Sequence, residues 1–205
     1  MLTGRRAKGA SLVELLIGIT VLALLLSYAT TTAREYIQNT HIRTAAESIV
    51  SGMQYAKSEA LKRNAQVRFQ LVNDLTGGCN LASNGESWVV SLDDPTGNCA
   101  AALSETVAPR ILERRAAAEG SANADVVASS TPAAGGNNSM LIYNGLGRLA
   151  LSNTNRFDRL RISNPSGGSC LPSGTMRCLD IVVTAGGDGR ICDPSITVTT
   201  DSRYC

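Results

Sequence analysis

An apolar run near the amino terminus restricts what this chain can fold into. Residues 12–29 read LVELLIGITVLALLLSYA, eighteen residues with a single charge, Glu14. A run of this length and character is just long enough to cross the hydrocarbon core of a bilayer as an α-helix. Arg5, Arg6 and Lys8 precede it, and basic residues hold that end of a membrane helix in the cytoplasm. The pattern predicts a membrane-inserted helix with the rest of the chain outside the cytoplasm.

Two ordinary interpretations of this run are a secretory signal peptide and a simple membrane anchor. A signal peptide would be cut after the small-x-small sequence at residues 27–29, which would make Thr30 the first mature residue. Glu14 fits neither interpretation, because a carboxylate inside a membrane helix costs roughly 2.5–3.5 kcal/mol even on insertion scales. Its position in the first turns lowers that cost, since the helix dipole favours an anion there. The charge nevertheless implies a partner group.

The helical pattern continues beyond the apolar run. Apolar residues recur at alternating spacings of four and three, which places them on one helix face: Ile42, Ala46, Ile49, Met53, Ala56 and Ala60. No proline occurs before Pro95, and Asn64 is a residue type that ends helices. We predict one helix over residues 10–64, apolar on all sides at residues 10–32 and amphipathic at residues 33–64.

After Asn64 the periodicity changes from helical to alternating. Residues 67–71 read VRFQL, which predicts a strand with one buried face. Further strand-like runs lie at residues 87–92, 107–112, 124–128, 140–143, 148–151, 157–162, 178–184 and 196–199. Turn-rich segments with Gly, Asn, Asp and Pro separate these runs. The sequence therefore predicts a head of short antiparallel strands over residues 65–205.

All six cysteines lie in this predicted head: Cys79, Cys99, Cys170, Cys178, Cys192 and Cys205. An even number of cysteines outside the cytoplasm indicates three disulfides, and six cysteines allow fifteen pairings. We favour pairing between nearest neighbours (79–99, 170–178 and 192–205), because each bond then closes a loop around a turn. The last bond would hold the carboxyl-terminal tail.

The composition argues against catalysis and against binding of nucleic acid by bulk charge. The only histidine, His41, lies on the predicted helix, so the residues for His-dependent triads and His-ligated metal sites are missing. The sequence contains neither a P-loop nor a dinucleotide-binding fingerprint. The chain has 19 Lys and Arg against 17 Asp and Glu, a net charge of only +2. We expect no enzyme activity, no cofactor and no metal site.

The amino-terminal residues resemble the class III signal of type IV pilins and type II secretion pseudopilins. Gly9 is followed by ASLVELLIGITVLALLL, and the family has a short basic leader, a Gly after which prepilin peptidase cuts, and a Glu five residues into the mature chain. The resemblance implies cleavage between Gly9 and Ala10, N-methylation of Ala10 and an assembly role for Glu14. The ammonium of one subunit's first residue would neutralise the Glu of a neighbour, so the buried charge is paired on assembly.

Segments of the head resemble FimT/FimU/GspH-type minor pilins and pseudopilins. Residues 54–64 (QYAKSEALKRN) are similar to the A-R/K-S-E-A-x-K-R-N segment that precedes their first strand, and residues 87–94 (SWVVSLDD) to their G-W-x-V-F-x-D strand and turn. Residues 142–148 (IYNGLGR) are similar to their F-N-G-x-G-R turn, and residues 189–194 (GRICDP) to their G-R-x-x-C terminal strand. The turn and the carboxyl-terminal cysteines favour the type IV pilus members.

The resemblance implies a pilin-like α+β fold, in which a long amino-terminal helix, membrane-spanning in its first half, packs on a carboxyl-terminal antiparallel β head. The parts would be a leader (residues 1–9), the helix (10–64) and a disulfide-stapled head (65–205). Before assembly the chain would be a single-pass inner-membrane protein with its head in the periplasm; afterwards it would belong to a surface pilus. The implied partners are prepilin peptidase, other minor pilins and the major pilin.

The implied function is that of a minor pilin that primes pilus assembly at or near the tip. Two alternatives are a GspH-like pseudopilin of type II secretion and a DNA-binding pilin subunit for DNA uptake in natural transformation. Some members of this branch contact DNA through arginines near the carboxyl-terminal strand, and the candidates here are Arg190, Arg203, Arg177 and Arg148. Arg159 and Arg161 are also predicted to share one strand face, which is typical of a solvated polar face. DNA binding by so few arginines would be weak and salt-sensitive.

Overall fold

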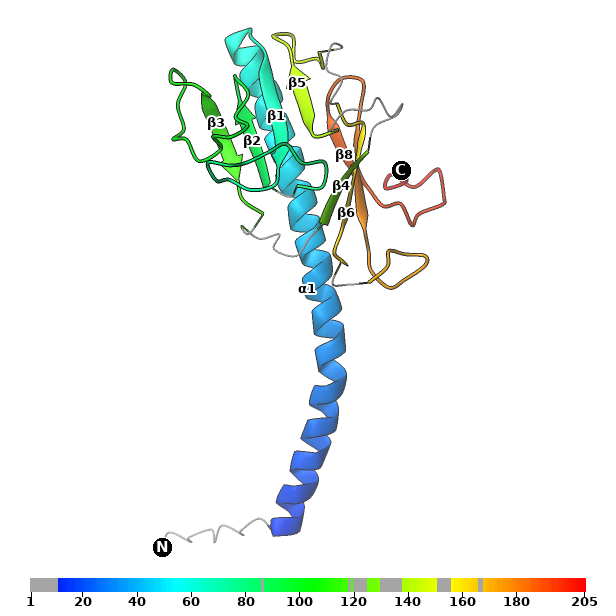
Figure 1. Ribbon diagram of the computed structural model, residues 1–205. Coiled ribbons are helices and arrows are strands. Elements are labelled where there is room, and N and C mark those ends of the chain that lie inside the picture. The colour runs from blue at the N-terminus through cyan, green and yellow to red at the C-terminus, as the bar shows by residue number, and fades with distance from the viewer. Residues whose placement is uncertain are drawn as a thin grey trace, which may run out of the picture. The chain divides into compact units, whose positions relative to one another are not determined.

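The computed structural model describes residues 11–85, 87–117, 119, 125–129, 138–150, 156–165 and 168–205, apart from the side chains of residues 26–34, 125, 126 and 128. The described part contains one helix, α1 (Leu12–Arg63), and eight strands that form two sheets (Figure 1). The chain divides into two compact units, Met1–Ile37 and Gln38–Cys205. The described part of the first unit is the start of α1, and the second unit holds the rest of α1 with both sheets.

Helix α1 ends where the sequence predicts, at Asn64. Asn64 has a φ of 47°, in the left-handed region that Asn tolerates better than most residues. Its N–H donates to the carbonyl of Leu61 (3.3 Å), and the N–H of Ala65 donates to that of Ala60 (3.2 Å). These two bonds form a Schellman motif, which satisfies helix carbonyls that have no partner within the helix.

The second half of α1 supplies the apolar face that the sequence predicts. All six residues of that face, from Ile42 to Ala60, are no more than 1% exposed. They belong to one core cluster with residues of both sheets, including Phe69, Leu141 and Ile181. Burial of each large side chain contributes about 1.5–3 kcal/mol, so the amphipathic half of α1 and the β head are stabilised by the same core.

Each sheet has four antiparallel strands. The first has the order β3-β2-β1-β5 and is built from β1 (Val67–Val72), β2 (Ser87–Ser91), β3 (Ile111–Arg115) and β5 (Met140–Tyr143). The second has the order β4-β6-β7-β8 and is built from β4 (Asp125–Ser129), β6 (Arg159–Ser163), β7 (Leu179–Val183) and β8 (Gly189–Cys192). The predicted α+β class with an antiparallel head is confirmed.

Two of the predicted strands, at residues 107–112 and 148–151, are shorter in the structure. The strand predicted at residues 107–112 begins only at Ile111, because the N–H of Arg110 donates to the carbonyl of Val107 (2.9 Å) and closes a turn immediately before it. In the range 148–151 the described residues form a single bridge, between Tyr143 and Leu149, because residues 144–148 make a tight turn instead. Residue 151 lies outside the described part.

The prediction at residues 196–199 is wrong, since these residues pair with no strand of the described chain. The last strand is β8, which pairs with β7 through a turn at residues 184–188. The alternation of ITVT is typical of a strand, but a strand also needs a neighbour. The N–H of Ile196 instead donates to the carbonyl of Asp193 (3.2 Å) and closes a turn over residues 193–196. The resemblance to the G-R-x-x-C terminal strand had indicated β8 correctly.

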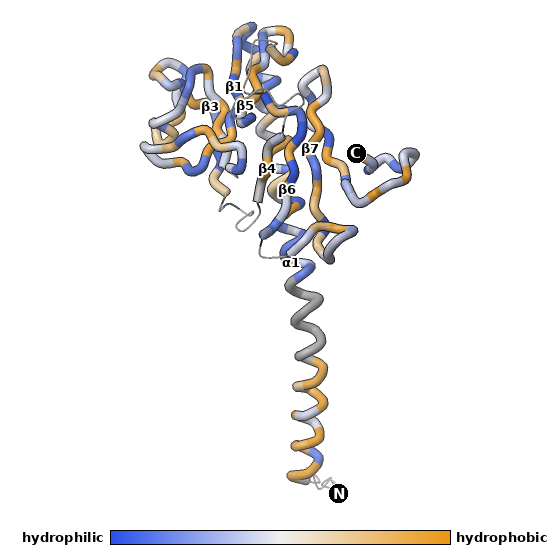
Figure 2. The backbone as a smooth tube through the Cα atoms, turned by 45° about the vertical axis from the view of Figure 1, so that its right-hand side comes forward, coloured by the Kyte–Doolittle hydropathy of each residue, from blue (hydrophilic) through white to orange (hydrophobic). Residues whose placement is uncertain are grey.

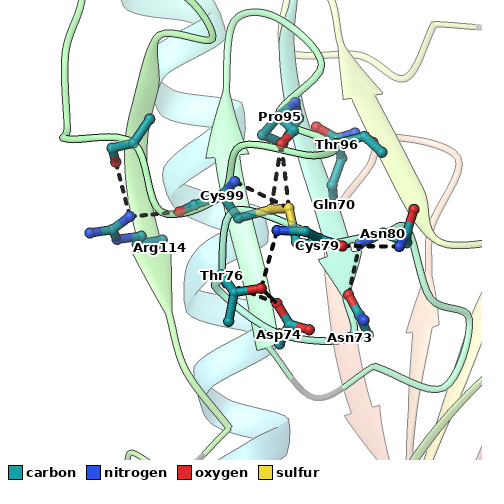
Figure 3. Close-up of a disulfide and its surroundings, with 12 residues drawn as sticks. Gln70, Asn73, Asp74, Thr76, Cys79, Asn80, Pro95, Thr96, Cys99 and Arg114 are labelled. Carbon is teal, nitrogen blue, oxygen red and sulfur yellow. Dashed lines mark hydrogen bonds between the residues drawn. A yellow bond between two sulfur atoms is a disulfide. The ribbon is translucent and has the colours of Figure 1, made fainter.

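Three disulfides join the nearest-neighbour pairs that the sequence favours: Cys79–Cys99, Cys170–Cys178 and Cys192–Cys205. The first bond is fully buried and connects the loop after β1 to the loop after β2 (Figure 3). Around it, the N–H of Gly97 donates to the carbonyl of Cys79 (2.8 Å), and Arg114 Nη1 donates to the carbonyls of Cys99 (2.6 Å) and Ala101 (2.9 Å). The bond and these donors hold two long loops on the first sheet.

Candidate assembly helix and arginine surfaces

The first turns of α1 present apolar side chains to the solvent. The large apolar residues between Leu12 and Leu25 are 50–76% exposed, and the corresponding turns stand out as hydrophobic in Figure 2. A soluble protein rarely leaves so much contiguous apolar surface uncovered, and such surfaces mark contacts with partners or with lipid. Within the part of the chain that the structure describes, no helix is both long enough and apolar enough to span a membrane.

Glu14 is the acidic residue of the first turn of α1, and its side chain is exposed. The positive end of the helix dipole stabilises a carboxylate at this position. No ion pair joins Glu14 to another residue of the described chain. Gly9 and Ala10, the predicted cleavage and methylation site, lie outside the described residues.

The structure brings three of the four candidate DNA-binding arginines together at the carboxyl-terminal loop that Cys192–Cys205 closes. Arg190 Nη1 donates to the carbonyls of Tyr204 (2.9 Å) and Ser202 (3.4 Å). Arg177 Nε lies 3.4 Å from Asp193 Oδ2, and the N–H of Asp193 donates to the carbonyl of Arg203 (2.8 Å). Arg148 takes no part in these bonds and lies on the turn after β5, where its carbonyl accepts from the N–H of Asn144 (2.8 Å).

The arginines of this loop are largely engaged by carboxylates. Arg203 donates to both oxygens of Asp201, at 3.1 Å and 2.8 Å, and these bonds lower the pKa of Asp201 to about 2. Arg177 has Asp193 as its partner. Two of the three arginines at this loop are thus matched by one anion each, and only Arg190, which bonds backbone carbonyls, leaves positive charge for a polyphosphate.

A second arginine arrangement lies on β6, where the sequence predicts that Arg159 and Arg161 share one strand face but does not indicate their common partner. Arg159 and Arg161 both bind the carboxylate of Asp180 on β7, which is completely buried. The alternation of β6 places both arginines on one face, but Asp180 becomes their partner only through the register between β6 and β7. Nothing in the linear sequence gives that register.

The described helix and head define the class of protein. An amino-terminal helix, apolar at its start and amphipathic where it packs on an antiparallel β head, is the pilin architecture. The family model described as "Type II transport protein GspH" matches residues 45–187, well over half of the chain, and the chain therefore belongs to this family of pseudopilins and minor pilins.

Solved structures similar to the chain include two crystal forms of the Pseudomonas aeruginosa type IV minor pilin FimU. One is 16% identical, with a TM-score of 0.41, and covers 75% of this chain and 93% of its own. The other is 17% identical, with the same TM-score, and covers 75% of this chain and 89% of its own. No curated protein matches the sequence.

Proposed function

We propose that this chain is a minor pilin of a type IV pilus that primes assembly at or near the pilus tip. The observation that carries the proposal is the exposed apolar surface of Leu12–Leu25, interrupted by one carboxylate, in a chain whose head belongs to the GspH family. In a filament, this surface packs against the corresponding helices of other minor pilins and of the major pilin. The chain binds partners and catalyses no reaction.

Glu14 specifies that packing through its charge. Among apolar helices an unpaired carboxylate costs several kcal/mol. A cation on a neighbouring helix offsets this cost only when the two helices pack in the correct register. Cleavage after Gly9 by prepilin peptidase creates such a cation, the ammonium of Ala10, which remains charged when it carries one methyl group. Before assembly, the same apolar surface lies in the inner membrane, with the head in the periplasm.

Mass spectrometry of the mature chain tests the processing step. We expect the mass of residues 10–205 with one added methyl group, and the full-length mass for a Gly9→Val variant, whose larger side chain blocks the cleavage site. A mature chain that starts at Thr30 would show an ordinary signal peptide and would remove Glu14 from the protein. That result would overturn the proposal.

A second candidate function is that of a type II secretion pseudopilin, and the description of the matching family favours it. The assembly mechanism at Glu14 is the same in both cases, but the two candidates predict different phenotypes. Deletion of a minor pilin removes surface pili and leaves exoprotein secretion intact. Deletion of a pseudopilin has the opposite effect, so both phenotypes should be measured in one deletion strain.

A further inference from the structure

One face of the second sheet points away from the core that the sheet shares with α1. Leu160 and Ile162 of β6 are fully buried in that core, so Arg159 and Arg161, which alternate with them, lie on the opposite face. Cross-strand partners share a face: Val127 of β4 is opposite Arg161. On the other side of β6, Val182 and Asp180 of β7 are opposite Arg159 and Arg161. We call this surface, formed by Val127, Arg159, Arg161, Asp180 and Val182, the arginine face.

The arginine face has more cations than anions. Arg161 binds Asp180 through two bonds, from Nε (2.9 Å) and Nη2 (3.0 Å), and Arg159 adds one from Nη1 (3.3 Å). Asp180 is completely buried, whereas the side chains of Arg159 and Arg161 are 43% and 46% exposed. A guanidinium has five N–H donors, so both arginines keep donors that face the solvent. One buried carboxylate thus holds two guanidinium groups in place and neutralises only one of them.

The excess charge is local. Three other arginines of this half of the head are each matched by a carboxylate: Arg156 by Asp158 (3.0 Å), Arg177 by Asp193 (3.4 Å) and Arg203 by Asp201 (2.8 Å). Arg190, which is opposite Val182 on β8 and therefore lies on the same face, directs its guanidinium to two carbonyls of the carboxyl-terminal tail and not to a carboxylate. Arg159 and Arg161 are therefore positioned to receive a single additional anionic group.

We propose that the arginine face docks a partner protein through a carboxylate side chain, with aliphatic groups of that partner packed on Val127. The carboxylate fits the free donors of Arg159 and Arg161, which the strands and Asp180 already orient, so little side-chain entropy is lost on binding. Val127 is 45% exposed beside Arg161 and provides the apolar part of the contact.

Charge and composition favour a protein over a nucleic acid as this partner. A duplex presents a row of phosphates, whereas Arg156, Arg177 and Arg203 are already paired with carboxylates and offer no excess charge to the phosphates beyond the first. No aromatic residue belongs to the arginine face to stack on a base. The arginine face would dock a partner of this chemistry in either kind of filament, a pilus or a secretion pseudopilus.

Fluorescence anisotropy with the full-length chain in a non-ionic detergent tests this docking. The probe is a labelled peptide of glutamates separated by alanine and valine, and the control probe has glutamine at each glutamate. We expect the acidic peptide to bind at least about threefold more tightly than its neutral control at low salt, as one or two exposed ion pairs provide. We expect Arg159→Gln, which leaves the two bonds between Arg161 and Asp180, to remove most of that difference.

Two further variants make the result specific. Arg177→Gln removes an arginine of similar exposure whose charge is already matched, and it should leave binding of the acidic peptide within about twofold of the wild type. Val127→Glu supplies a carboxylate beside Arg161 without changing the arginines, and it should weaken binding as Arg159→Gln does. Equal binding of both peptides, equal losses in Arg159→Gln and Arg177→Gln, or tighter Arg159-dependent binding of duplex DNA than of the acidic peptide would overturn the proposal.

Discussion

Gly187 lies where the turn between β7 and β8 touches the core. Its φ is +83°, and an added Cβ would lie 2.7 Å from Cε1 of Tyr143. The Tyr143 hydroxyl also donates to the carbonyl of Gly187 (2.7 Å), so the ring has no room to move away. A side chain at residue 187 is therefore opposed both by backbone conformation and by a buried ring.

Gly187→Ala should lower the free energy of unfolding by about 2–4 kcal/mol, the sum of the left-handed backbone cost and the overpacking of Tyr143. Chemical denaturation of the two proteins measures the difference. Gly77→Ala is the matched control, because a Cβ at residue 77 meets nothing within 4 Å, and it should change stability by less than about 0.5 kcal/mol. Equal effects of the two substitutions would contradict this account of the turn.

The hydrogen bonds from Arg203 make Asp201 a marker for the carboxyl-terminal loop at low pH. The pKa of Asp201 is lowered from 3.8 to about 2, so the charged pair stabilises the loop above about pH 4 and is lost as the pH falls toward 2. An NMR titration of the Asp201 carboxyl carbon should show its midpoint near the lower value. In Arg203→Gln the midpoint should rise toward 3.8, and an unchanged midpoint would show that Arg203 is not the cause.

At the scale of single residues, the sequence identified the groups whose role depends on local neighbours. Asn64 as the end of the helix is one such residue, because its effect arises within a few positions of the chain. The two arginines around Asp180 depend instead on strand register, which the sequence does not specify. Gly187 likewise becomes restricted only when Tyr143, far away in sequence, packs against it.

At the scale of elements, α1 was predictable because a 3.6-residue period extended over many turns without a proline. The strands were less predictable, since alternation marks a strand only if a partner strand is present. Residues 196–199 alternate without a partner, whereas β8 pairs although its sequence alternates poorly. A turn accounts for the late start of β3, because the N–H of Arg110 donates to the carbonyl of Val107 immediately before the strand.

The bond Cys192–Cys205 is the covalent attachment of the tail to β8. The two cysteines are 13 residues apart in sequence. In the chain-entropy model, closing a loop of this length stabilises the folded protein by about 3 kcal/mol. The double variant Cys192→Ala, Cys205→Ala should lose about that stability in denaturation, and carboxypeptidase should trim its tail faster than that of the wild type. An unchanged rate of trimming would mean that the bonds of Asp193 and Arg190 hold the tail without the disulfide.

At the scale of the whole molecule, the chain's charge divides according to its predicted parts. The net charge of +2 includes Arg5, Arg6 and Lys8 of the predicted leader, and without them 16 Lys and Arg face 17 Asp and Glu. The predicted mature protein is therefore close to neutral, and its apolar surface is concentrated at the start of α1. This distribution suits a subunit that joins others through its helix, and it disfavours a protein that binds by bulk charge.

The most direct test of the proposed function is surface piliation in a strain that lacks this chain. We predict that deletion removes the pili, that the wild-type chain restores them, and that Glu14→Ala does not, because its helix cannot pair with a neighbour's amino terminus. Glu47→Ala, which removes an exposed carboxylate from the amphipathic half of α1, should restore piliation as the wild type does. Normal piliation in the deletion strain would contradict the proposed role.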